Sequence, residues 1–176
     1  MERIEIIPLD GIEIEGLGNI KLGQSKLAIE KLLGKGSPHS NTKQSFYDNY
    51  EFRLDFDKND NIEFIEFIYG PYPERTKLQI YGIDPFEIGG DQLIELLTQK
   101  NNGDIDLSEA DFSFGFLNIS VGIWRQFTEK DVLEEIEEMK KQGEYEDNKI
   151  ELEEDLAKSR NFWTIGIGIK NYYNLI

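Results

Sequence analysis

The strongest local pattern of potential ligand residues lies between positions 55 and 66. Asp55, Asp57 and Asn59 occupy alternate positions, and Glu66 lies eleven residues beyond Asp55. Carboxylate and amide oxygens at this spacing are the ligands that calcium prefers in a loop site. One hypothesis is therefore a cation site in which Asp55, Asp57, Asn59 and Glu66 are the candidate ligands.

Two features of the same segment favour a polar turn between two strands. Asp60 stands where a calcium loop of this type needs glycine for its sharp bend. The preceding residues alternate with a period of two, as Phe52, Leu54 and Phe56 show, whereas the helix–loop–helix calcium site needs a helix on each side. The predicted structure is a hairpin turn, and we expect neither a metal nor another cofactor there.

Few other residues have the chemistry that catalysis requires. The chain has no cysteine, which excludes thiolate metal sites and cysteine nucleophiles. The one histidine, His39, lies in a polar loop that lacks the glycine–serine turn of a serine hydrolase. The 35 acidic residues supply many carboxylate pairs, but no pattern marks one pair for acid–base work. We expect a protein that is not an enzyme; a carboxylate-based enzyme or a small-ligand protein is the alternative.

A second group of candidate residues lies in the highly charged segment 128–160. Its 33 residues include 13 acidic and six basic side chains, a net charge of −7. Dense charge of one sign speeds association with a partner of the opposite sign and helps to select it. The segment is therefore a candidate docking face for a basic protein, and its predicted contact residues are Glu134, Glu137, Glu138, Glu144 and Tyr145. The competing interpretation is a solvated pair of helices with Glu–Lys pairs on their surfaces.

The same segment has the signals of two helices. Thr128 is a suitable N-cap, and Val132, Leu133, Ile136 and Met139 form an apolar stripe at helical spacing. Gly143 interrupts this stripe, and a second helix follows with leucines of its own.

Tyrosine in an exposed loop is a further candidate for partner contact. Tyr72 lies in the proline-containing loop 70–75. A tyrosine side chain supplies rigid, amphipathic contact area at protein interfaces. We therefore add Tyr72 to the predicted partner-binding residues.

The overall charge narrows the partner classes. Lys and Arg number 19 against 35 acidic residues, which gives a net charge of −16 over 176 residues. This charge disfavours nucleic acid and anionic membranes as partners, because both attract basic proteins.

The longest uncharged apolar stretch, 112–124, is too short to span a bilayer. The N-terminus lacks the basic-then-apolar pattern of a secretory signal. We expect a cytoplasmic protein.

The hydrophobic periodicity predicts how the elements are ordered along the chain. Alternating and helical patterns indicate strands at 4–6, 12–14, 52–56, 62–69, 78–81, 112–116, 119–123 and 163–169, and helices at 25–33, 91–98 and within 128–160. The predicted fold class is α+β, with an antiparallel sheet and an acidic helical insertion, 128–160, before the last strand. The chain is expected to form one compact domain, 1–176, from two tandem helix-plus-meander halves, 1–70 and 76–176.

Residues 22–56 carry a resemblance to a known fold. The run Leu22-Gly23-Gln24-Ser25, then Leu32-Leu33-Gly34, Pro38 and the strand Phe52–Phe56 resembles a repeat unit of the β-lactamase-inhibitor-protein-like fold. The whole chain also resembles small, acidic bacterial immunity proteins, which bind and block a toxin made by the same cell. This resemblance implies a non-enzymatic inhibitor that covers a basic active site in its partner.

Overall fold

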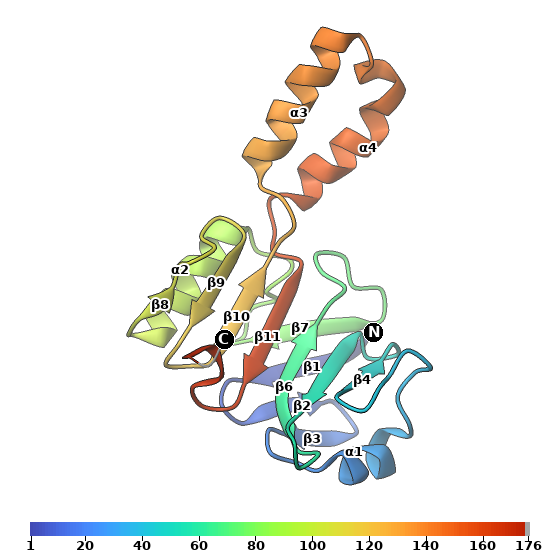
Figure 1. The fold of residues 1–176 in the computed structure, drawn as a ribbon, viewed down its shortest axis with the longest axis vertical. Coiled ribbons are helices and arrows are strands. Elements are labelled where there is room, and N and C mark those ends of the chain that lie inside the picture. The colour runs from blue at the N-terminus through green and yellow to red at the C-terminus, as the bar shows by residue number, and fades with distance from the viewer. Residues whose placement is uncertain (175–176) are drawn as a thin grey trace.

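The computed structural model describes residues 1–174, whose strands form two sheets (Figure 1). The four-stranded sheet, in the order β3-β2-β1-β7, consists of β1 (Glu2–Ile7), β2 (Gly11–Ile14), β3 (Gly18–Lys21) and β7 (Thr76–Ile80). The seven-stranded sheet, in the order β4-β5-β6-β11-β10-β9-β8, consists of β4 (Gln44–Tyr47), β5 (Phe52–Phe56), β6 (Ile62–Phe67), β8 (Ile105–Asp106), β9 (Ser113–Phe116), β10 (Val121–Trp124) and β11 (Thr164–Gly168). The helices are α1 (Lys26–Leu33), α2 (Gly90–Asn101), α3 (Glu129–Gln142), α4 (Tyr145–Lys158) and the short 3-10 helix η1 (Tyr172–Asn174).

This arrangement confirms the predicted α+β class. The helices α1 and α2 lie where the apolar stripes at 25–33 and 91–98 predict them. The helices α3 and α4 lie within the acidic segment 128–160, between β10 and the last strand, β11, as expected. Among residues 1–174, no helix is both long enough and apolar enough to cross a membrane.

The pairing of the strands differs from the single antiparallel sheet that was expected. The strands are divided between two sheets, and β7 pairs in parallel with β1, so that Ile4 lies opposite Leu78. Alternation in the sequence shows which face of a strand is apolar but does not show which strand is its neighbour.

The last strands of the two predicted halves, β6 and β11, are antiparallel neighbours in the seven-stranded sheet. The duplication itself stays a prediction.

One hydrophobic core contains side chains from both sheets. The buried isoleucines of β1 and β2 and three phenylalanines of β5 and β6 (Phe52, Phe56 and Phe67) belong to one buried cluster, together with Ile29 of α1 and Leu93 and Leu97 of α2. In β5, Phe52, Leu54 and Phe56 all face this core, which explains the period of two in the sequence. The intervening side chains lie on the opposite, outer face of the seven-stranded sheet.

Glycines on this outer face make room for the C-terminal segment. Gly122 of β10 and Gly166 of β11 are cross-strand partners. A methyl group at Gly122 would overlap the ring of Tyr173, and one at Gly166 would overlap the ring of Phe64. The Tyr173 hydroxyl donates to Gly166 O at 3.4 Å, and burial raises the pKa of this tyrosine well above its ordinary value. The bare face of β11 is therefore a packing surface for η1.

A buried carboxylate joins the turn before β5 to the start of β7. Glu51 is 3% exposed, and its Oε1 accepts hydrogen bonds from Glu74 N at 2.7 Å and from Arg75 N at 3.1 Å. Its Oε2 accepts from Thr76 N at 2.9 Å and from the Thr76 hydroxyl. These bonds hold the loop that leads from β6 of one sheet to β7 of the other, because buried carboxylates need such partners.

Replacing Glu51 by glutamine should destabilise the whole domain. The amide group of glutamine places an N–H where one oxygen now accepts bonds, so we expect the free energy of unfolding to fall by about 2 kcal/mol. Urea denaturation measures this change. Glu74→Gln is the control, because Glu74 is exposed and contributes only its backbone N–H to the same cluster. Equal stabilities of the two variants would contradict the role given to the Glu51 carboxylate.

Candidate protein-docking site

The helices α3 and α4 form a hairpin that projects away from both sheets (Figure 1). We call residues 128–160 the arm. Its two ends meet at one place, because Trp124 of β10 is the cross-strand partner of Thr164 of β11, and Trp163 N donates to Trp124 O at 2.7 Å. The arm is therefore an excursion from a continuous pair of strands.

The arm has a small hydrophobic core of its own. Val132, Ile136 and Leu152 are buried between the two helices, separately from the main core. Met139 packs against them, so three of the four residues in the predicted apolar stripe have the expected role. The fourth, Leu133, is 47% exposed. The prediction for Leu133 is wrong because one facing helix covers only a narrow stripe of α3, and Leu133 lies beside that stripe.

Local sequence signals set the ends of α3. The Thr128 hydroxyl accepts a hydrogen bond from Asp131 N at 3.3 Å, and the Asp131 carboxylate accepts one from Thr128 N at 2.8 Å. This reciprocal pair is a capping box, with aspartate in the place of the more common glutamate. Gly143 ends the helix with a φ of +80°, a left-handed conformation that favours glycine. The predicted cap and break are both confirmed.

Aromatic and charged contacts hold the base of the arm. The ring centroids of Phe127 and Trp163 lie 4.8 Å apart, with the rings nearly at right angles, and the ring centroid of Trp124 lies 6.4 Å from that of Trp163. Arg160 Nε lies 3.0 Å from Glu129 Oε1, which links the two ends of the arm. The sequence pattern did not indicate this cluster, since its members are far apart in the chain.

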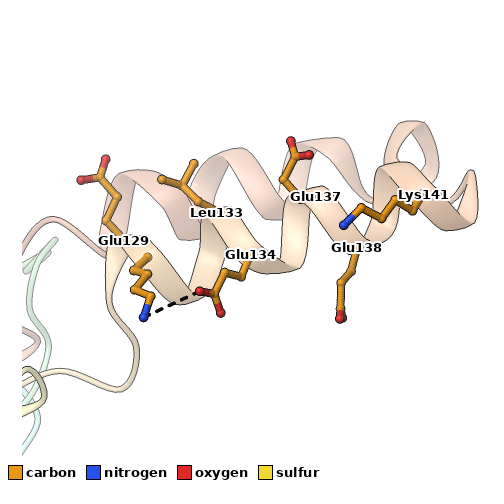
Figure 2. Close-up of a pocket in the computed structure, with 7 residues that line it drawn as sticks. Glu129, Leu133, Glu134, Glu137, Glu138 and Lys141 are labelled. Atoms are coloured by element: carbon orange, nitrogen blue, oxygen red, sulfur yellow. Dashed lines mark ion pairs between the residues drawn. The ribbon is translucent and has the colours of Figure 1, made fainter.

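A shallow, open groove of about 640 Å³ runs along the exposed face of α3, opposite the side that packs against α4. The residues that line it are Glu129, Lys130, Leu133, Glu134, Glu137, Glu138 and Lys141. Figure 2 shows Leu133 between Glu129 and Glu137, with Glu134 and Glu138 in the neighbouring row. Lys130 Nζ lies 3.8 Å from Glu134 Oε1, and Glu138 has no ion pair with any residue in the described range 1–174.

The structure brings three of the predicted contact residues together and separates the others. Glu134, Glu137 and Glu138 share the groove on α3. Glu144 and Tyr145 lie at the far tip, where Tyr145 packs against the arm's core and under the Lys140 ammonium group.

Tyr72 does not lie on the arm. It is 61% exposed in the loop that follows β6. The end of β6 lies beside the start of β11, since Phe67 pairs with Ile165. The role of Tyr72 in partner contact stays a prediction.

The four candidate cation ligands do not form one cluster. The Asp57 carboxylate caps the turn between β5 and β6 by accepting from Asn59 N and Asn61 N, and these backbone bonds lower its pKa. Asp55 and Glu66 instead lie on the outer face of the sheet, each 2.9 Å from the Arg53 guanidinium. Within residues 1–174, no group of three or more histidine or acidic side chains has the arrangement of a metal site.

The environment of Asp55 and Glu66 changes their acidity. Burial raises the pKa of both carboxyls, and the charge of Arg53 acts in the opposite direction. The guanidinium supplies the positive charge between these two carboxylates. The arrangement matches an ion-paired network within the fold.

Comparison with known proteins identified no related protein. No protein-family profile, curated protein or solved structure matches this chain. The functional argument therefore rests on the geometry of the arm.

Replacing Thr128 by alanine should loosen the arm without unfolding the body. The change removes one half of the capping box and should cost α3 about 1 kcal/mol. Because the arm's core is separate from the main core, we expect faster amide hydrogen exchange in the first turns of α3 and an unchanged rate in β5 and β6. Gln142→Ala, exposed at the other end of α3, is the control. Unchanged exchange in Thr128→Ala would show that the box does not hold the helix.

Acid should weaken the same cap. The backbone hydrogen bond from Thr128 lowers the pKa of Asp131. A carboxyl with a lower pKa in the folded state contributes fully above its unfolded pKa of about 3.9, and this contribution is lost as the pH falls through the folded value. Amide signals of residues 128–131, followed by NMR during acid titration, should therefore show a transition that Asp131→Asn lacks. A transition at the same pH in both proteins would assign it to another group.

Proposed function

We propose that this chain is a non-enzymatic protein-binding module of the immunity or inhibitor type, whose arm docks on a basic protein such as a toxin. One observation carries this proposal: the acidic segment 128–160 is a helical hairpin that projects from the body. The arm has a net charge of −7 in 33 residues, and the remaining 143 residues together have a net charge of −9.

The shape of the arm suits a concave partner surface. Each helix has 14 residues, which corresponds to a length of about 21 Å. A projecting element of this size can enter a cleft that a flat sheet surface cannot reach. Clefts that bind polyanions are lined by lysine and arginine, so an acidic arm is complementary to them in charge. By occupying such a cleft, the arm would block access to it.

The ion pairs within the arm do not account for its charge. Exposed pairs such as Lys130–Glu134 and Lys149–Glu153 lie at helical spacing and contribute little to stability. Thirteen acids face six bases in this segment, so the excess carboxylates repel one another. A basic partner would relieve this repulsion, which gives the surplus charge a role that folding does not supply.

The alternative hypothesis of a carboxylate-based enzyme or a small-ligand protein has weaker support. Asp55 and Glu66 are the half-buried carboxylates closest to that description, but both are ion-paired with Arg53. The arm, in contrast, is exposed and has no partner within the described chain.

Neutralising three acids of the groove should weaken partner capture. We compare the tagged wild type with Glu134→Gln/Glu137→Gln/Glu138→Gln by affinity capture from the native cells, at low and at high salt. The wild type should retain a stoichiometric basic protein, and the variant should lose most of it. With that protein purified, stopped-flow mixing should show about tenfold slower association and a weaker dependence on salt for the variant.

The matched control removes the same charge from the body. Glu13→Gln/Glu95→Gln/Glu109→Gln changes three exposed carboxylates outside the arm, so its net charge equals that of the arm variant. Capture by this control should be close to that of the wild type. If both variants lose the partner equally, or if the captured protein is acidic, the proposed function is wrong.

A further inference from the structure

We infer that the partner presents a basic amphipathic helix to the outward face of α3 and packs an apolar side chain of that helix on Leu133. This inference rests on the proposed function and deepens it, because it names the kind of element that the arm receives. It begins from the contrast between neighbouring residues of one helix. Val132 is 2% exposed and Ile136 is 8% exposed, whereas Leu133 between them is 47% exposed.

The groove has the geometry of a helix-packing surface. Glu129, Leu133 and Glu137 follow one another on α3 at a spacing of four residues, and so do Lys130, Glu134 and Glu138. Rows at this spacing are the ridges that interdigitate when two helices pack. The groove extends from residue 129 to residue 141, a length of about 18 Å. An occupant helix of about twelve residues would match it.

The surroundings of Leu133 set the chemistry of the occupant. An apolar centre within a charged rim is the usual composition of an energetically important contact. Here the rim carries Glu129, Glu134, Glu137 and Glu138 against two lysines at the ends of the groove. Glu129, Glu134 and Glu137 form exposed ion pairs with Arg160, Lys130 and Lys140, and Glu138 has none within residues 1–174. An uncharged occupant would remove these groups from water without supplying a positive charge, which is costly. The occupant must therefore place lysine or arginine on both sides of its apolar residue.

Charge also disfavours a second copy of the same arm as the occupant. Two arms would each bring a net charge of −7 to one interface, and like charges at close distance are repelled. Helix pairing between copies through this groove is therefore disfavoured, and a basic partner remains.

The test uses two designed peptides of identical composition. One is a helical 14-mer, about the length of α3, with leucines on one stripe and lysines on both flanks. The other has the same residues in an order that scatters the leucines around the helix. Fluorescence anisotropy at about 0.15 M salt measures the affinity of each for the full-length protein. The amphipathic peptide should bind about tenfold more tightly than the scattered one.

Two variants of the arm distinguish the groove from general charge attraction. Leu133→Lys and Ile150→Lys each add one positive charge, and both positions are exposed, with Ile150 on α4 at 77%. Leu133→Lys should weaken binding of the amphipathic peptide by about tenfold, and Ile150→Lys by less than about threefold. Leu133→Ala and Ile150→Ala repeat the comparison without a change of charge, and alanine keeps the helices intact.

Each outcome separates this inference from the proposed function. If the two lysine variants weaken binding equally, or if the two peptides bind equally, the groove does not recognise a helix and the inference is overturned. The proposed function would then still stand on its own capture experiment, since an arm can engage a basic cleft through charge alone. If Leu133 variants lose the amphipathic peptide and Ile150 variants keep it, the inference is supported.

Discussion

The pairing of β10 with β11 is the constraint on which the arm and its proposed use depend. Trp124 and Thr164 are cross-strand partners, so the strands that lead into and out of the arm are about one strand spacing apart, close to 4.8 Å. β11 also lies between β6 and β10 in the seven-stranded sheet, and Ile165 and Ile167 are buried in the main core. The arm is therefore anchored in a central strand, which a partner cannot displace without disturbing the core.

The body and the arm differ in how much apolar surface stabilises them. The body shares one core between two sheets and two helices, whereas the arm buries Val132, Ile136 and Leu152 between α3 and α4. A helical pair with so small a core opens more readily than the sheets do. The Phe127–Trp163 contact and the Glu129–Arg160 ion pair at the base add stabilisation that the small core of the arm does not supply. A bound partner would stabilise the arm further, because it binds the folded hairpin only.

Acidic residues have different roles in the two parts of the molecule. Glu51 is buried and accepts hydrogen bonds that join the two sheets, and Asp55 and Glu66 are paired with Arg53. In the groove of α3 the carboxylates face water, and their lysine neighbours lie on the same helix. Negative charge is thus used for folding in the body and remains available for contact in the arm.

The candidate site was predicted in part. Segment 128–160, its two helices and the groove residues Glu134, Glu137 and Glu138 follow from charge and periodicity alone. The exposure of Leu133 does not follow from them. The spacing of an apolar residue in the sequence is the same whether a neighbouring helix covers it or leaves it exposed. The cluster at the base of the arm was not predicted either, since Trp124 and Trp163 are separated by the whole arm in the sequence.

The sequence by itself determined the features that depend on a few neighbouring residues. Thr128 and Gly143 mark the ends of α3, and Asp57 marks the turn between β5 and β6, because capping and turn hydrogen bonds form within about four residues. Only the tertiary structure decided that β7 lies parallel to β1 and that Leu133 faces outward. These outcomes depend on which distant segments compete for the same apolar surface, and a local pattern contains no information about that competition.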